Sequence, residues 1–243
     1  MIKMSRRACT VFARPLRTFL VLTFSAALQG CVSVQPAPES ALANLGELKM
    51  ALREYHDSGR YAHDLDAVDA RALEYVRAQA SNVAKPALVL DIDETSLSNW
   101  EQIQADDFGY FVDGPCDSLP KGPCGALAWD ESGRAAAIAP TLKLFDAARL
   151  AHVAVFFVTG RHEAQRAATE RNLRKAGYSD WSDLFMRPNG THTPAAEYKS
   201  AQRAAIEARG FTIIANVGDQ PSDLAGGHAQ RGFLLPNPFY RIP

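Results

Sequence analysis

Two aspartates that follow a short apolar run are the residues of this chain best placed to do chemistry. The run Ala87–Leu90 leads directly to Asp91 and Asp93. Alternate side chains of an extended chain point to the same side, so the two carboxylates leave the strand together. Two carboxylates that close repel each other unless a cation or a shared proton lies between them. A lone pair of this kind usually marks a solvated acidic turn, and the rest of the chain decides between these interpretations.

Two later apolar runs, Val153–Val158 and Phe211–Val217, also end in polar residues. A helix predicted to start near Tyr198 adds a lysine close to its N-terminal end. In a parallel sheet the carboxyl ends of the strands meet at one edge, where ligands bind. We therefore expect one site that contains residues from all of these segments. Besides Asp91 and Asp93, its candidate residues are Thr159, Gly160, Lys199, Asp219 and Asp223.

The elements that must position these residues alternate between apolar runs and segments of helical spacing. Such alternation predicts an α/β fold, a three-layer Rossmann-like parallel sheet with helices on both faces. Two further helices, broken near Ser58–Gly59, precede the first strand. We expect the last residues, 237–243, to run over the surface. The predicted strands are 87–92, 153–158, 184–186, 211–217 and 232–236, and the predicted helices after the first strand are 140–150, 163–176 and 198–208.

Residues 96–139 are expected to form a small cap-like insertion after the first strand. Long segments of this kind are usually binding loops or lids. We expect some of its aromatic residues to pack into a small core and one or two to line the mouth of the site. Cys116 and Cys124 are candidates for a disulfide, with a metal site as the competing interpretation, although no histidine lies nearby to complete one. The aromatic residues are Trp100, Phe108, Tyr110, Phe111 and Trp129.

The first thirty residues have the features of a signal peptide. They hold five basic and no acidic side chains, and the apolar stretch 16–28 is too short to span a bilayer. The full chain has 26 basic and 27 acidic residues, and loss of residues 1–30 would leave 21 against 27, a net charge of −6. With no basic stripe, we expect no nucleic-acid polymer as partner.

The segment Leu28–Cys31 resembles the lipobox of bacterial lipoproteins. That resemblance implies that Cys31 is lipidated and anchors the protein to a membrane, with residues 31–40 as a tether. Val32 favours the outer membrane, so we expect an exported lipoprotein at the periplasmic side or the cell surface. Plain secretion with cleavage nearby is the alternative. Residues 41–243 are then expected to form the folded domain.

The motifs together resemble the haloacid dehalogenase (HAD) superfamily of phosphohydrolases. Within it, they are similar to acid phosphatases of the bacterial class C and plant vegetative-storage-protein type. The resemblance spans about residues 42–240. The matching segments are Asp91–Asn99, Val158–Arg161, Glu197–Ser200, Asn216–Gln220 with Ser222–Leu224, and Leu235–Tyr240.

This resemblance implies a role for each candidate residue. Asp91 would be the nucleophile that forms an aspartyl-phosphate, and Asp93 the acid and then the base. The implied cofactor is Mg²⁺, held by the Asp91 side chain, the Asp93 backbone carbonyl and Asp219, with Asp223 supporting that geometry. Thr159, Gly160 and Lys199 would bind the phosphoryl oxygens. Arg161 and Arg203 fit phosphate binding and a structural ion pair equally well.

We therefore expect a metal-dependent acid phosphatase that acts on small phosphate monoesters. Nucleoside monophosphates are plausible substrates because an aromatic insertion could stack a base, and sugar or aryl phosphates fit almost as well. Phosphotransfer to an alcohol uses the same motifs. A non-catalytic binding or storage protein on the same scaffold is the alternative from another class, and a surface adhesin is a weaker one. The intact Asp91 and Asp93 favour an enzyme.

Overall fold

Five parallel strands form the central sheet in the computed structural model, which describes residues 42–242. The strand order is β5-β4-β1-β6-β7, so the first strand of the chain lies in the middle. The signal peptide, Cys31 and the tether lie outside the described residues. The strands are β1 (Pro86–Leu90), β4 (Ala154–His162), β5 (Asp183–Arg187), β6 (Thr212–Gly218) and β7 (Arg231–Leu234).

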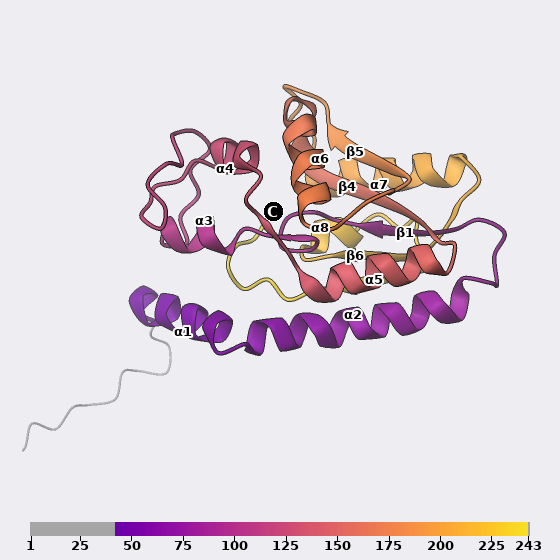
Figure 1. Cartoon of the computed structure of the whole chain (residues 1–243), viewed down its shortest axis with the longest axis horizontal. Coiled ribbons are helices and arrows are strands. Elements are labelled where there is room, and N and C mark those ends of the chain that lie inside the picture. Colours follow the sequence, from indigo (N-terminus) through magenta and orange to yellow (C-terminus); the bar gives the residue numbers. More distant parts are fainter. Residues whose placement is uncertain (1–41, 243) are drawn as a thin grey trace, which may run out of the picture. The chain divides into compact units, whose positions relative to one another are not determined.

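The side chains of β1 alternate between two hydrophobic layers, as expected for a strand covered on both faces. Leu88 and Leu90 face the layer that contains α2 (Arg60–Gln79) and α5 (Ala139–Leu150), two helices that lie side by side (Figure 1). Ala87 and Val89 face α7 (Ala195–Ala208) on the other side. The predicted α/β architecture is thus confirmed. The remaining helical segments of this part are η1 (Glu163–Gln165), α6 (Arg166–Lys175) and α8 (Pro221–Leu224).

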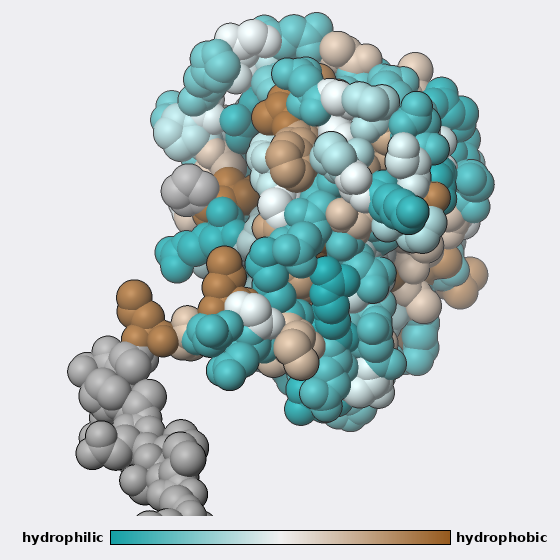
Figure 2. All heavy atoms as spheres, turned by 90° about the vertical axis from the view of Figure 1, so that its left-hand side faces the viewer, coloured by the Kyte–Doolittle hydropathy of each residue, from teal (hydrophilic) through white to brown (hydrophobic). Residues whose placement is uncertain are grey.

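The two predicted N-terminal helices are present, and they break where expected. α1 (Leu45–Asp57) is capped by the Asn44 side chain, and Gly59 separates it from α2 with a φ of 81°, a conformation that glycine adopts without strain. α2 buries one face against the sheet, whereas α1 has no buried residue. Figure 2 shows that apolar side chains on this side of the molecule are scattered among polar ones. Among the residues described, no helix has the length and apolar character needed to cross a membrane.

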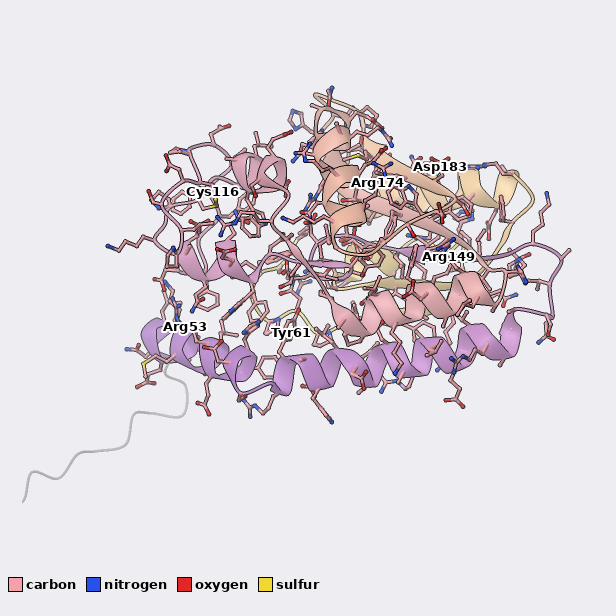
Figure 3. The ribbon with its side chains drawn as sticks, in the orientation of Figure 1. Arg53, Tyr61, Cys116, Arg149, Arg174 and Asp183 are labelled. Atoms are coloured by element: carbon pink, nitrogen blue, oxygen red, sulfur yellow. A yellow bond between two sulfur atoms is a disulfide. The ribbon has the colours of Figure 1, made fainter. Side chains whose placement is uncertain are left out.

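The insertion is joined to the sheet by a short antiparallel pair, β2 (Leu97–Ser98) and β3 (Ala136–Ala137). Between them lie α3 (Trp100–Ala105) and α4 (Ala126–Ser132), and the connecting loop contains a disulfide between Cys116 and Cys124 (Figures 1 and 3). Trp129 is buried, and Trp100 and Phe108 are half-buried against the core. Tyr110 and Phe111 are exposed.

The largest differences from the predicted boundaries lie in β4, α6 and α7. β4 continues through Thr159–Arg161 as a bulge, since these residues lie opposite the single residue Met186 of β5. α6 starts only after the short turn η1. α7 begins at Ala195, after Pro194, so Lys199 lies in its second turn and not at its N-terminal end. Pro238, Arg241 and Ile242 are exposed, as predicted for residues 237–243, but the prediction was wrong for Phe239. Phe239 is buried between α2 and the insertion. Its ring centre lies 4.9 Å from that of Tyr61 in α2 and 5.1 Å from that of Trp100 in α3, and these contacts remove the apolar ring from water.

Candidate active site

The carboxyl ends of the three central strands bring together residues that are far apart in the sequence. β1 lies between β4 and β6, and the backbone N–H of Asp91 donates a hydrogen bond to the carbonyl of Val217 at 3.0 Å. Asp91 therefore leaves the sheet beside Asp219, and Thr159 follows on the neighbouring strand. All three side chains are buried.

Three carboxylates form a buried acidic cluster, which consists of Asp91, Asp219 and Asp223. One oxygen of each lies within 4.8 Å of the others. The backbone at Gly218 makes this possible, because a side-chain carbon at Gly218 would lie 2.3 Å from the Asp223 Cβ. Burial, together with Asp223 and Asp219 and against the effect of Lys199, raises the pKa of the Asp91 carboxyl well above its ordinary value. The cluster is thus a site of excess negative charge.

Lys199 supplies the positive charge inside this cluster. Its Nζ donates to Asp91 Oδ1 at 2.6 Å and to Asp223 Oδ1 at 2.5 Å. Burial lowers the pKa of Lys199, but the two carboxylates outweigh it and hold that pKa above its ordinary value. Lys199 therefore stays charged, and it fixes the position of Asp91. One cation against three carboxylates still leaves the cluster short of positive charge.

Asp219 is oriented by three side-chain donors, its neighbour Gln220 and two residues from other parts of the chain. Its Oδ1 accepts from Thr95 at 3.1 Å, and its Oδ2 accepts from Gln220 and Asn237 at 2.7 Å each. Burial and the neighbouring Asp223 raise the pKa of Asp219 to about 6. The other oxygen of Asp223, Oδ2, accepts the backbone N–H of Gln220 at 2.8 Å. Protein donors thus hold both carboxylates at the end of β6.

The Asp93 carboxylate is paired with Arg161 and is not part of the acidic cluster. Arg161 Nη2 lies 2.6 Å from Asp93 Oδ1, and Asn99 Nδ2 donates to the same oxygen at 2.9 Å. Burial raises the pKa of Asp93, but Arg161 and Asn99 outweigh it and leave that pKa below its ordinary value. Asp91 and Asp93 therefore have different surroundings, which allows two carboxylates of one strand end to serve two purposes.

Thr159 and Gly160 lie in the bulge of β4. Thr159 is fully buried, and its Oγ1 accepts the backbone N–H of Arg161 at 3.1 Å. Of the two predicted candidates for phosphate contact, Arg161 forms ion pairs with Asp93 and with Asp130 of the insertion. Arg203 instead donates to the backbone carbonyls of residues 223, 225 and 227. Arg203 thus supports the loop after β6.

Several residues at the site were not predicted from the sequence. Glu94 is buried beside the strand end and accepts from Asn99 and from Tyr240 of the C-terminal segment. Burial raises the pKa of Glu94 to about 8. Asn237 and Asp130 reach Asp219 and Arg161 from segments that carry no strand-end signal. The Asn–Pro–Phe–Tyr sequence near the C-terminus resembled the family, but nothing local linked it to the site.

The acidic cluster has the donor chemistry of a site for a hard divalent cation. Its three buried side chains offer only carboxylate oxygens, the ligands that Mg²⁺, Ca²⁺ and Mn²⁺ prefer. A divalent charge would also offset the carboxylates that Lys199 leaves uncompensated. Asp91, Asp219 and Asp223 are therefore the described residues that could hold such an ion.

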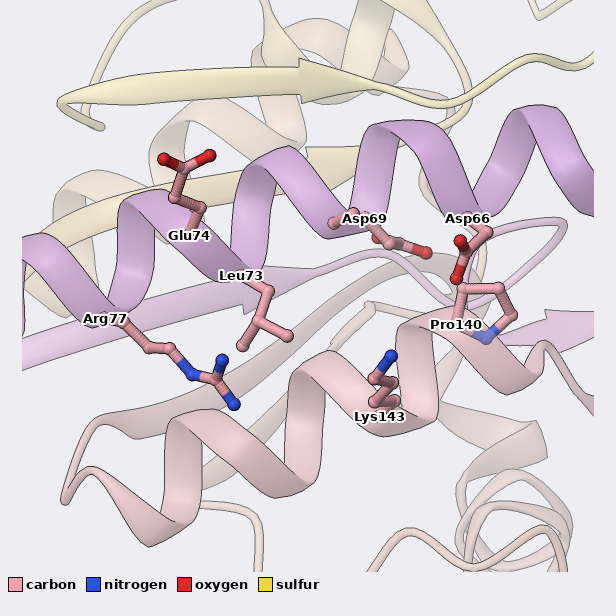
Figure 4. Close-up of a pocket in the computed structure, with 8 residues that line it drawn as sticks. Asp66, Asp69, Leu73, Glu74, Arg77, Pro140 and Lys143 are labelled. Carbon is pink, nitrogen blue, oxygen red and sulfur yellow. The ribbon is translucent and has the colours of Figure 1, made fainter.

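A cavity of about 210 Å³ lies elsewhere, between α2 and α5 (Figure 4). Asp69 lines it, and its Oδ2 accepts from Thr141 at 2.8 Å. Burial raises the pKa of Asp69 to about 7. This cavity is built from helix side chains and contains none of the predicted site residues, so we place the function at the strand ends.

Comparisons with known proteins agree with this geometry. A family model described as HAD superfamily, subfamily IIIB (acid phosphatase) matches residues 31–243. Acid phosphatase 1 of Solanum lycopersicum is 35% identical over 196 residues, 79% of this chain and 73% of that protein. Vegetative storage protein 1 of Arabidopsis thaliana is 29% identical over 188 residues, 76% of this chain and 67% of that protein.

The fold is also similar to a solved structure. The class C acid phosphatase from Bacillus anthracis aligns with a TM-score of 0.62 at 18% sequence identity, covering 81% of this chain and 86% of that one. The family model covers most of the chain, including every strand of the sheet and every residue of the acidic cluster. The chain therefore belongs to the acid phosphatases of HAD subfamily IIIB and is a phosphomonoesterase.

Proposed function

We propose that this protein is a Mg²⁺-dependent phosphatase that hydrolyses small phosphate monoesters through an aspartyl-phosphate on Asp91. The observation that carries the proposal is the pair of environments at the end of β1. Asp91 lies in a buried acidic cluster and is fixed by Lys199, whereas Asp93 is held apart by Arg161 and Asn99. An anionic nucleophile can approach an anionic phosphate only where positive charge is concentrated.

In the first step, a carboxylate oxygen of Asp91 forms a bond to phosphorus as the bond from phosphorus to the alcohol oxygen breaks. Asp93 must carry a proton at this step, although Arg161 and Asn99 lower its pKa, and it gives that proton to the leaving oxygen, so the alcohol departs neutral. Lys199, Thr159 and the Gly160 N–H bind the oxygens of the transferring phosphoryl group. In the second step, Asp93 takes a proton from water, and the resulting hydroxide attacks phosphorus and frees Asp91 and inorganic phosphate.

Mg²⁺, held by Asp91, the Asp93 backbone carbonyl and Asp219, would offset negative charge on the phosphate and the carboxylates. The chain's own residues fit this assignment. Asp223 keeps Lys199 beside Asp91 and binds the backbone after Asp219, which supports both sides of the cluster. Thr95, Gln220 and Asn237 orient Asp219 by hydrogen bonds.

For substrates, we propose small monoesters such as nucleoside monophosphates, sugar phosphates and aryl phosphates. The insertion supplies exposed Tyr110 and Phe111, which could contact an aromatic leaving group. The test is phosphate release from a panel of these esters by the full chain in detergent, with Mg²⁺ or EDTA. Asp91→Asn should abolish phosphate release for two reasons. An amide is a poor nucleophile, and the substitution also removes one of the three carboxylates of the cluster.

Asp180→Asn is the matched control, since Asp180 is exposed and its φ of 53° suits asparagine. It should leave the release rate unchanged. Phosphate release that is independent of Mg²⁺ and of Asp91 would refute the proposal. No release from any ester, by a folded protein, would favour a binding or storage protein instead. Adding an alcohol to the assay separates hydrolysis from phosphotransfer, since transfer lowers free phosphate relative to released alcohol.

We also propose that the protein is exported and anchored to a membrane through a lipidated Cys31, in the outer membrane if the cell has two. This rests on the sequence of residues 1–32 alone. Two acyl chains hold a protein firmly on a bilayer, whereas one holds it only marginally. Expression of Cys31→Ser should release the protein from the membrane fraction, and a variant that stays membrane-bound would contradict the anchor.

A further inference from the structure

Helix α4 of the insertion places two adjacent side chains against the partners of Asp93. Trp129 is buried, and its Nε1 donates to Asn99 Oδ1 at 2.8 Å. Asp130 Oδ1 lies 2.9 Å from Arg161 Nη2. Asn99 and Arg161 both contact the carboxylate of Asp93. Two hydrogen-bonded links therefore run from the insertion to the acid–base residue.

The two links meet at one oxygen of Asp93. Oδ1 accepts from Arg161 Nη2 at 2.6 Å and from Asn99 Nδ2 at 2.9 Å, which uses both of its lone pairs, and it shares the Arg161 Nε donor, at 3.2 Å, with Oδ2. Oδ2 has a single long contact with Arg161 Nε, at 3.2 Å. Because Oδ1 is saturated, Oδ2 is the oxygen that is left to exchange a proton with the substrate.

The link from Asp130 to Arg161 is also anchored at both of its residues. Gln165 Nε2 donates to Asp130 Oδ2 at 2.5 Å, and Arg161 Nη1 lies 3.4 Å from the hydroxyl of Thr169. The side chain of Arg161 is only 3% exposed, whereas that of Asp93 is 29% exposed. The guanidinium that holds Asp93 is therefore packed inside the protein, whereas the Asp93 side chain is partly open to solvent.

We propose that α4 is a positioning element for proton transfer. Trp129 and Asp130, acting through Asn99 and Arg161, hold Asp93 so that its Oδ2 faces the leaving oxygen of the substrate. This inference rests on the proposed function, in which Asp93 protonates the leaving group. It assigns the insertion a task in the chemical step, in addition to any contact that it makes with substrate.

The consequence differs between substrates. A nitrophenolate leaves as a stable anion and needs little help from Asp93, whereas an alkoxide must be protonated as it leaves. General acid catalysis contributes roughly 10²–10⁴-fold, and a small displacement of the acid forfeits part of this. Misplacing Asp93 should therefore slow hydrolysis of an alkyl phosphate far more than that of p-nitrophenyl phosphate.

The test measures kcat and KM of the full chain on p-nitrophenyl phosphate and on β-glycerol phosphate. Asp130→Asn should lower kcat on β-glycerol phosphate by roughly 10- to 100-fold more than on p-nitrophenyl phosphate, with similar KM changes on both. Glu131→Gln, the same chemical change at the next, exposed position of α4, should alter both rates by no more than about twofold. Trp129→Phe keeps a six-membered aromatic ring but removes the five-membered ring of the indole with its N–H, and it should shift the ratio in the same direction.

Equal losses on both substrates in Asp130→Asn and Trp129→Phe would show a merely structural role and overturn the inference. Unchanged rates in both variants would overturn it as well. If Asp130→Asn does not fold, Trp129→Phe alone decides between these outcomes. A folded, unaltered protein that hydrolyses neither ester would refute the proposed function itself, which is a distinct result.

Discussion

Lys199 is the cation at the centre of the buried acidic cluster, and its replacement should reveal how the cluster is stabilised. Its Nζ lies 2.6 Å from Asp91 and 2.5 Å from Asp223, and the side chains of all three residues are at most 7% exposed. Removing one partner of a buried ion pair leaves an uncompensated charge, at a cost of about 3–5 kcal/mol. We predict a loss of this size in the free energy of unfolding for Lys199→Met.

The loss should depend on pH in a defined direction. The carboxyl pKa of Asp91 is already raised by burial, and Lys199 is the neighbour that lowers it. Without Lys199, Asp91 has a raised pKa in the folded state and its ordinary pKa in the unfolded chain. At pH values between these two, the folded state binds a proton that the unfolded chain does not bind. Stability of the variant should therefore increase as the pH falls through the raised pKa, and the deficit relative to the unaltered protein should shrink.

The assay is urea unfolding followed by tryptophan fluorescence, at about pH 8 and about pH 5, with EDTA present so that no divalent cation compensates the carboxylates. Lys143→Met is the matched control. Lys143 is exposed on α5, so its loss should change the free energy of unfolding by no more than about 0.5 kcal/mol. An equal free energy of unfolding for Lys199→Met and the unaltered protein, or a deficit that is the same at both pH values, would refute the reasoning.

Two other variants test Asp219 of the cluster and, in the separate cavity between α2 and α5, Asp69. Asn237→Ala removes a hydrogen-bond donor to Asp219 and should weaken Mg²⁺ binding by roughly 10- to 100-fold, as measured by calorimetry. Unchanged affinity would show that the C-terminal segment does not orient Asp219. Asp69→Asn tests the carboxylate buried between α2 and α5. Because the pKa of Asp69 is about 7, the folded protein loses stability as the pH rises from about 4 to about 7. The roughly three-unit shift corresponds to at most about 4 kcal/mol, so the asparagine variant should show a flatter pH dependence of unfolding, and an unaltered pH profile would contradict this.

The fold class could be predicted because the strands of this sheet are buried on both faces. Such strands appear in the sequence as short continuous apolar runs, and those before Asp91, Thr159 and Asp219 are clear examples. The start of one helix could not be predicted as well. A helix from about Tyr198 is predicted, whereas α7 begins at Ala195, directly after Pro194. Proline fits well at the start of a helix, so Pro194 is a local signal for the earlier start.

The supporting residues of the site could not be predicted in the same way. Asn237, Asp130 and Glu94 act through partners that are 18 to 146 positions away in the chain. Polar residues of this kind are common in turns and helices, so their types alone do not indicate a site. Residues 237–243 are predicted to run over the surface, yet Phe239 packs against Tyr61 of α2, which Figure 3 labels.

The sequence by itself determined which segments are strands and which polar residues follow them, because both signals are local. That was enough to bring Asp91, Thr159 and Asp219 to one edge of a parallel sheet and to indicate the family. Only the tertiary structure decided how these carboxylates differ from one another. Lys199 reaches Asp91 across 108 positions, and Arg161 reaches Asp93 across 68. The charge state and orientation of a buried carboxylate depend on its neighbours in space, and folding alone decides which residues these are.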